Sequence, residues 1–239
     1  MRSWPAWFGV ELNVVSYKEK FVSGLGGFLA ILALIVISER TLFTSAYPLI
    51  ASMGASAVLV FAVPHGQLSQ PWPVIAGHVF SALIGVTCAK FIPYPGVAMA
   101  ASVSLSIGAM HQFKCIHPPG GATALSAVMG GPAVHALGFK FVLAPVLFNA
   151  VAIIAIAVAF NAFFSWRRYP ALFNHPATTS KSTGTSGAPL PASHDDVVEA
   201  LRSLDSFVDI TEADLIRLSQ ILRLPREPKD LKRNAFTAG

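Results

Sequence analysis

The chain has 239 residues, of which 54% are hydrophobic and only 12% are charged, and its formal net charge is +5. About a quarter of the residues in a soluble domain are charged, so this composition excludes an ordinary soluble protein and indicates a membrane protein. The basic residues are scattered at the ends of apolar stretches and form no stripe with aromatics, which argues against nucleic acid as a partner and predicts membrane-flanking anchors.

Residues 1–20 mix aromatic and charged residues without the apolar core of a signal peptide, which predicts a segment at the membrane interface. Residues 21–170 are predicted to form an all-α transmembrane domain. Four segments of this domain are close to the roughly 17 to 25 apolar residues that a membrane-spanning helix needs. These four predicted long transmembrane helices are residues 21–38, 73–92, 96–111 and 141–165.

Two further apolar segments, residues 48–64 and 117–132, are shorter and rich in glycine. As helices, their apolar parts would cover about 15 to 20 Å of a hydrocarbon core about 30 Å thick, so we predict two short, broken or half helices. Gly54 and Gly121 occupy equivalent places in them, and the same offset relates two of the long segments. This pattern favours a 3+3 inverted repeat. The alternative is a chance match between small-residue patterns that are common in helix packing.

Six crossings would bring both ends of the domain to one side, and a small excess of basic residues there predicts that this side is cytoplasmic. Residues 171–194 are rich in Ser, Thr, Gly and Pro and are predicted to be a flexible linker. Residues 195–239 carry apolar residues at helical spacing and are predicted to form a helical tail.

The stretch KCIHPPGGATAL, residues 114–125, interrupts the apolar pattern. A bilayer tolerates such a break only where it is buried in protein or lines water, because backbone polar groups need partners. The prolines end one helix and suit the first turn of the next, whose free N–H groups and dipole attract anions. The predicted anion-binding residues here are Lys114, His117, Pro118, Pro119, Gly120, Gly121, Ala122 and Thr123. We expect the backbone of Gly120 and Gly121 to contribute more than the His117 imidazole.

Gly54, Ala55 and Ser56 are the corresponding candidates in the first short segment. The hydroxyls of Ser52, Ser56 and Thr123 are groups that could donate to a permeating anion. His78, midway along a long segment, is a further candidate because its ring can donate a hydrogen bond to an anion. For both His78 and His117 the alternative is a purely structural hydrogen bond.

No Asp or Glu occurs between Glu39 and Asp195, and this absence indicates the sign of the charge on the ligand. Cation channels and proton-coupled carriers usually depend on Asp or Glu inside the membrane, so an anion is favoured. The same absence argues against an enzyme, since a Ser or Cys nucleophile would lack an orienting acid. His111, Cys115 and His117 fit no common zinc spacing, and no metal or other cofactor is expected.

The motif HPPGGATAL resembles the signature of the HPP family of integral membrane proteins, named for His-Pro-Pro. Residues 48–64, 67–86 and 131–152 resemble further parts of that family in the same order. The resemblance implies a membrane protein of a bacterium or plastid, and we expect the bacterial inner membrane. It also implies nitrite transport, which is described for plant members. The tail at residues 195–239 resembles the connector that precedes CBS domains in bacterial members, and no CBS domain is expected within the chain.

These observations predict a channel or transporter for a small monovalent anion, acting in the lipid bilayer as a homo-oligomer. Nitrite is the favoured anion because of the family resemblance. The alternative is a membrane-embedded sensor that signals through its C-terminal helices.

Overall fold

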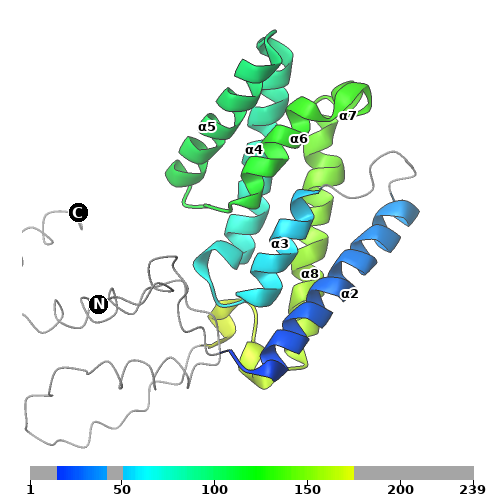
Figure 1. Ribbon diagram of the computed structural model, residues 1–239, viewed down its shortest axis with the longest axis vertical. Coiled ribbons are helices and arrows are strands. Elements are labelled where there is room, and N and C mark those ends of the chain that lie inside the picture. Colours follow the sequence, from blue (N-terminus) through cyan, green and yellow to red (C-terminus); the bar gives the residue numbers. More distant parts are fainter. Residues whose placement is uncertain (1–14, 42–50, 175–239) are drawn as a thin grey trace, which may run out of the picture. The chain divides into compact units, whose positions relative to one another are not determined.

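Prolines and glycines divide the apolar part of the chain into helices of unequal length (Figure 1). The computed structural model describes residues 15–41 and 51–174, and in these ranges it contains helices, turns and loops but no strand. The predicted tail, nearly all of the predicted linker and the first residues of the predicted interfacial segment lie outside these ranges. The main helices are α2 (Tyr17–Thr41), α3 (Ser52–Ala62), α4 (Pro71–Phe91), α5 (Pro95–Gln112), α6 (Pro119–Met129), α7 (Gly131–Leu137) and α8 (Phe148–Ala162). The shorter elements are η1 (Gln67–Ser69), η2 (Val142–Leu147), η3 (Ser165–Arg167) and η4 (Ala171–Asn174).

Three helical stretches in the described ranges are long and apolar enough to cross a membrane, namely Tyr17–Arg40, Pro71–Phe91 and Val142–Ala162. They correspond to three of the four predicted long helices. The fourth, predicted at 96–111, forms α5, which has 18 residues but is not among these three. The last stretch is interrupted rather than regular, because Ala144 has an extended backbone (φ −136°, ψ 117°) just before Pro145. Proline has no N–H to continue the hydrogen bonding of a regular helix.

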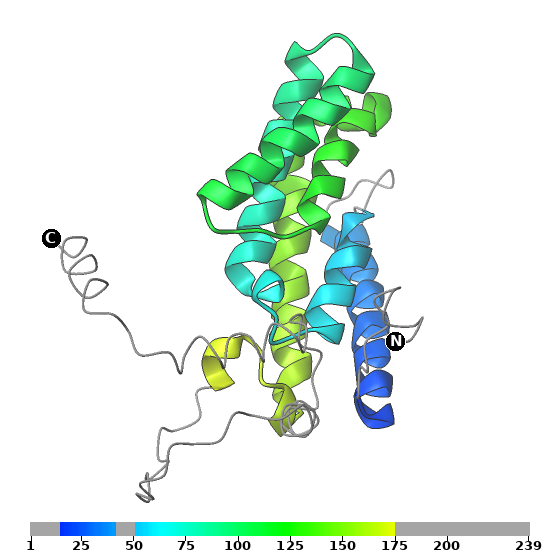
Figure 2. The same cartoon turned by 60° about the vertical axis from the view of Figure 1, so that its left-hand side comes forward.

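The two short segments form helices α3 and α6, each of 11 residues, or about 16 Å of helix. Figure 1 shows that α3 runs from the middle of the helical unit toward the end where α2 begins, whereas α6 runs from the middle toward the opposite end. Figure 2 shows the same arrangement from a second direction. The N-terminal halves of the two helices meet, and the hydroxyls of Ser52 and Thr123 are 2.7 Å apart.

Helices α4 and α6 pack very closely, and glycines on both helices make this possible. A Cβ added to Gly85 would lie 2.6 Å from the carbonyl oxygen of Ala124, and one added to Gly120 would lie 2.9 Å from the carbonyl oxygen of Gly77. Larger residues at these positions would push the helices apart. The main apolar core joins the surrounding elements through side chains that include Leu34, Phe61, Val74, Val146 and Ile153.

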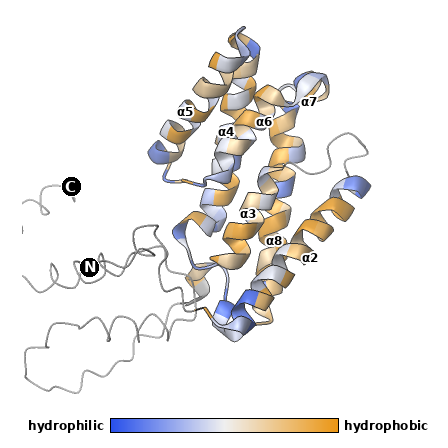
Figure 3. Ribbon diagram, in the orientation of Figure 1, coloured by the Kyte–Doolittle hydropathy of each residue, from blue (hydrophilic) through white to orange (hydrophobic). Residues whose placement is uncertain are grey.

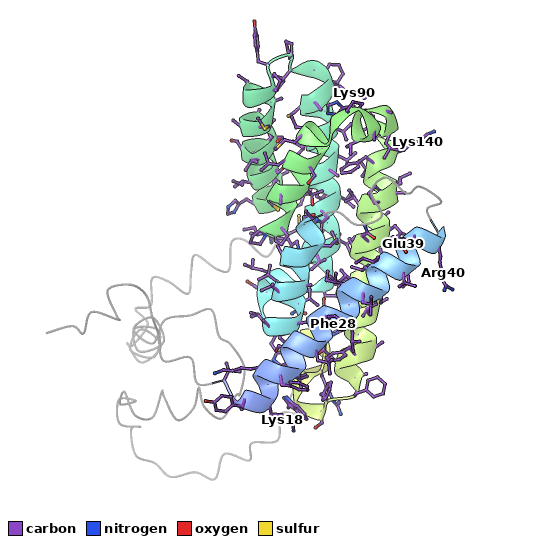
Figure 4. The ribbon with its side chains drawn as sticks, turned by 45° about the vertical axis from the view of Figure 1, so that its right-hand side comes forward. Lys18, Phe28, Glu39, Arg40, Lys90 and Lys140 are labelled. Carbon is purple, nitrogen blue, oxygen red and sulfur yellow. The ribbon has the colours of Figure 1, made fainter. Side chains whose placement is uncertain are left out.

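Hydrophobic residues make up much of the helices (Figure 3), and many of their side chains are exposed on the outside of the described unit. On α2, Phe21, Phe28 and Leu32 are 71%, 65% and 47% exposed. Figure 4 shows Lys18 near one end of the described unit and Lys90 and Lys140 toward the other end, with Phe28 between them on α2. An apolar exterior with basic residues at its ends suits a protein that crosses a bilayer several times.

A buried ion pair joins α2 to η3, the turn after α8. Glu19 and Arg167 are 4% and 1% exposed and form an ion pair. Arg167 also donates hydrogen bonds to the side-chain oxygens of Asn161 and Ser23, each at 3.0 Å. It donates a further one to the carbonyl oxygen of Phe61 at the end of α3. Helix α2 therefore starts inside the segment predicted to lie at the interface, and Arg167 is buried rather than being a membrane-flanking anchor.

Candidate functional site

A fully buried polar cluster among the described helices is built around Ser56. Its hydroxyl oxygen lies 2.8 Å from Nε2 of His78 and 2.8 Å from Nε2 of His117. The two imidazole rings are 4.9 Å apart between centroids and meet edge to face at 66°. All three side chains are fully buried, and they come from three different parts of the fold: α3, α4 and the loop before α6. One hydroxyl therefore connects two histidines that are far apart in the sequence.

The hydrogen bonds continue on both sides of this cluster. Nδ1 of His78 lies 2.7 Å from the Thr123 hydroxyl, which is in turn 2.7 Å from the Ser52 hydroxyl. Nδ1 of His117 lies 2.8 Å from the carbonyl oxygen of Leu68 in η1. We call the five connected side chains the polar chain: Ser52, Thr123, His78, Ser56 and His117.

The carbonyl of Leu68 determines the direction of these hydrogen bonds. A carbonyl oxygen can only accept, so Nδ1 of His117 carries the hydrogen and Nε2 of the neutral ring is an acceptor. Ser56 then donates its single hydrogen to His117, and its oxygen accepts from Nε2 of His78. Nδ1 of the neutral His78 ring is left as an acceptor for the Thr123 hydroxyl. Because Thr123 donates its single hydrogen to His78, the Thr123 oxygen accepts from the Ser52 hydroxyl. Every hydrogen bond of the polar chain is therefore donated in the direction from Ser52 toward Leu68.

The loop that carries His117 is held against α4 by a glycine. A Cβ on Gly77 would lie 2.8 Å from the Cβ of His117 and 3.0 Å from the carbonyl oxygen of Cys115. The loop is also tied to the end of α5, since the Cys115 N–H donates to the carbonyl oxygen of Met110 at 2.9 Å. The absence of a side chain at residue 77 therefore allows His117 to reach Ser56 on the neighbouring helix.

The prediction that Gly120 and Gly121 present free N–H groups is wrong. The Gly120 N–H donates to the carbonyl oxygen of His117 at 2.8 Å, and the Gly121 N–H donates to that of Pro118 at 3.0 Å. The physical reason is that Pro118 already has helical backbone angles (φ −52°, ψ −38°), so tight turns close over both amides. Gly120 is instead a packing residue against α4. The imidazole of His117, which we ranked below these amides, lies inside the polar chain.

Four predicted site residues, Ser56, His78, His117 and Thr123, come together in the polar chain. The other predicted positions make no side-chain hydrogen bond to it, and most lie at the surface of the described unit. Those that are exposed are Gly54, Ala55, Lys114, Pro118 and Ala122, whereas Pro119 is buried. The site prediction did not include the Leu68 carbonyl. Ser52, one helical turn before Ser56, was expected only as a hydroxyl that could meet an anion, and the structure places it at the end of the polar chain.

No acidic side chain accompanies the polar chain. The only acidic residues in the described ranges are Glu19 and Glu39, both on α2. Glu19 is paired with Arg167, and Glu39 is exposed. In the same ranges, no group of three or more His, Cys, Asp or Glu is placed to hold a metal ion. The two rings of the polar chain therefore have hydroxyl and carbonyl partners rather than ionic ones.

The helices that carry the polar chain match a known protein family. A family model described as "HPP, transmembrane region" matches residues 12–170. This range contains all five members of the polar chain and is more than half of the sequence. The chain belongs to the HPP family. The family resemblance of the HPPGGATAL motif is thereby confirmed.

Curated relatives of this HPP protein include two transmembrane proteins of Dictyostelium discoideum. One is 37% identical over 171 residues, which cover 69% of this chain and 55% of the relative. The other is 40% identical over 151 residues, which cover 61% of this chain and 53% of the relative. The chain thus spans about half the length of the curated relatives that it matches. No solved structure matches the HPP chain.

Proposed function

We propose that this HPP protein is a transmembrane channel or transporter for a small monovalent anion, with nitrite as the first candidate. The observation that carries the proposal is the meeting of the N-terminal halves of α3 and α6 at Ser52 and Thr123, whose hydroxyls are 2.7 Å apart. Each helix N-terminus is equivalent to roughly half a positive charge, so two of them favour an anion at the same place. Among the described residues, no carboxylate is near to oppose this.

We propose that the anion passes along the α3–α6 junction, which we define by Ser52, Gly54, Ala55, Ala122 and Thr123. Gly121 lies beside it, on the side of α6 toward Val103 of α5. Gly54, Ala55 and Ala122 are exposed, and small or absent side chains leave the backbone of both helices uncovered. Hydroxyls can turn to donate to an ion that has only acceptor atoms. Nitrite, nitrate, formate and chloride all meet that description, and the family resemblance is the reason to test nitrite first.

The fold has features that support a 3+3 inverted repeat and a defined topology. Helices α3 and α6 run in opposite directions, which supports pairing α2, α3 and α4 with α5, α6 and the η2–α8 stretch (Figure 1). The start of α2 and η3 lie at the same end, where Lys18, Lys20 and Arg168 are exposed. We therefore propose that this end is cytoplasmic, in a bacterial inner membrane, and that both termini are on that side.

We also propose that the protein works as a homo-oligomer. The exposed side of the junction includes Gly54, Ala55 and Ala122 near the starts of two half helices. Small residues on an exposed helix surface let another helix approach closely inside a bilayer. A second copy of the chain would cover this surface.

Anion uptake by proteoliposomes tests the proposal. Purified protein is reconstituted into vesicles, and the entry of nitrite, nitrate, formate and chloride is compared with entry into protein-free vesicles. Faster entry of at least one anion with the protein is the expected result. If well-folded protein binds nitrite but moves none of these anions, the alternative of a membrane-embedded sensor replaces the transport proposal. No catalytic reaction and no cofactor are proposed.

A further inference from the structure

We propose that the polar chain carries a proton, so that each anion crosses the membrane together with one proton. This inference rests on the proposed anion transport and adds its coupling. It comes from the hydrogen bonds between Ser52, Thr123, His78, Ser56 and His117, which are 2.7 to 2.8 Å long and unbroken.

An imidazole ring can relay a proton because it takes a hydrogen at one nitrogen and releases another from the opposite nitrogen. His78 is placed to do this, since Nδ1 accepts from Thr123 while Nε2 donates to Ser56. The Ser56 hydroxyl then connects this ring to Nε2 of His117. A buried structural histidine also needs a partner at each nitrogen, but here the partners join both rings in a single line of hydrogen bonds.

Each proton transfer along this line conserves atoms and charge. Hydronium from the aqueous side gives a proton to the Ser52 oxygen, Ser52 passes its hydrogen to Thr123, and Thr123 passes its own to Nδ1 of His78. The net change at this stage is one hydronium converted to water and one neutral His78 converted to imidazolium. The proton at Nε2 of His78 then moves to Ser56 as the Ser56 hydrogen moves to His117, which becomes the imidazolium. The Leu68 carbonyl beyond His117 accepts a hydrogen bond but cannot pass a proton on, so the proton is released by the reverse of these transfers, through Ser52 to water, once the junction is open to the other side of the membrane.

The polar chain can accommodate the extra proton without leaving a buried donor unpaired. When His78 is charged, Thr123 can turn its hydrogen to the carbonyl oxygen of Pro119, which is 3.3 Å away. When His117 is charged, its Nε2 donates to the Ser56 oxygen, and the hydrogen that Ser56 has received points back to Nε2 of the now neutral His78, 2.8 Å away. Each protonated state therefore leaves every donor and acceptor of the two rings with a partner, so neither has the cost of an unmade hydrogen bond.

The surroundings of the two rings explain why a proton and an anion would move together. No Asp, Glu, Lys or Arg occurs in α3, α6, the η1 turn or the η2–α8 stretch. The one charged residue of α4 is Lys90, in its last turn, and α5 contributes the exposed His111. The loop before α6 adds exposed Lys114 and the buried Cys115 thiol, and the remaining titratable neighbour of each ring is the other ring. An imidazolium here lacks a counter-ion, and an anion at the junction lacks a cation. Each therefore increases the affinity for the other.

The test measures anion entry and proton entry in the same vesicles. Proteoliposomes containing a trapped pH-sensitive dye receive external nitrite, and nitrate is used in parallel because its acid does not cross the membrane unassisted. The expected result is internal acidification that follows anion uptake with one proton per anion, after subtraction of protein-free vesicles. Anion uptake without acidification would overturn the coupling and leave the proposed transport intact. Uptake of neither anion would overturn both.

Ser56→Ala separates the polar chain from a merely structural cluster, because it keeps both rings and removes only the link between them. We expect proton-driven anion uptake to fall by about tenfold or more. Ser56→Thr, which restores a hydroxyl, should recover most of it. Ser106→Ala is the matched control, because Ser106 is also buried but bonds only to the carbonyl oxygen of Ser102 within α5. If S56A does not fold, Thr123→Val breaks the line at the next link. Full proton coupling in a folded S56A or T123V protein would overturn the proposal.

Discussion

Gly77 of α4 and His117 lie so close together that a Cβ on residue 77 would be 2.8 Å from the Cβ of His117. Gly77→Ala must therefore displace the loop, and overpacking of this kind is expected to lower stability by about 1 to 3 kcal/mol. Thermal unfolding of the purified protein in detergent measures the effect. Gly27→Ala in α2 is the control, since no atom lies within 4 Å of a Cβ there. An unchanged unfolding midpoint for G77A would show that the loop does not depend on this contact.

The two neighbouring glycines at the start of α6 should respond differently to the same substitution. A Cβ on Gly120 would lie 2.8 Å from the Ser81 hydroxyl and 2.9 Å from the Gly77 carbonyl oxygen, whereas one on Gly121 meets only a methyl group of Val103 at 4.0 Å. Gly120→Ala is expected to separate α6 from α4 and cost about 1 to 3 kcal/mol, and Gly121→Ala is expected to be neutral or stabilising. Parallel unfolding curves compare them, and equal midpoints would contradict the packing role of Gly120.

The buried ion pair between Glu19 and Arg167 is expected to matter most when only one partner is removed. Glu19→Gln or Arg167→Gln leaves a buried charge without its counter-ion, which is expected to cost about 3 to 5 kcal/mol. The double variant leaves no unpaired charge, so it should lose less than the sum of the single losses. Unfolding free energies of the four proteins give the coupling directly. Strict additivity would mean that the two side chains act independently.

His65, in the loop after α3, is expected to make stability depend on pH. Burial lowers the pKa of His65 from its ordinary value of 6.5, and a hydrogen bond with the Arg168 backbone only partly offsets this. The folded state therefore binds a proton less readily than the unfolded state, so stability falls as the pH drops below 6.5 toward the folded-state pKa. His65→Gln should reduce this loss. The unfolding midpoint of both proteins is compared above and below that pH, and identical profiles would contradict the prediction.

The sequence allowed the helical type and approximate position of most long elements to be predicted, because length and apolar content are local properties. The short segments at 48–64 and 117–132 were expected from their glycines and length, and they form α3 and α6. The start of α2 was placed too late, because Glu19 is charged and looks like an interfacial residue. Its partner Arg167 is 148 positions away, and no local pattern links the two residues.

The members of the candidate site were partly predictable, but their connections were not. Ser56, His78, His117 and Thr123 stood out as polar residues in apolar surroundings, and all four belong to the polar chain. The bond from Ser56 to His117 joins residues 61 positions apart, and it depends on how α3, α4 and the loop pack. The error at Gly120 has a local cause, since the sequence did not reveal that Pro118 would already adopt helical backbone angles.

The most direct test of anion transport at the α3–α6 junction is nitrite uptake by proteoliposomes of the wild type, Gly121→Asp and Gly121→Asn. Residue 121 is only partly buried and has room for a side chain, and Asp and Asn have nearly the same size, so the two variants differ mainly in one negative charge. The transport proposal predicts that G121N retains most of the uptake and that G121D loses it by about tenfold or more, because a fixed negative charge repels the anion. Equal uptake by folded G121D and G121N would contradict it.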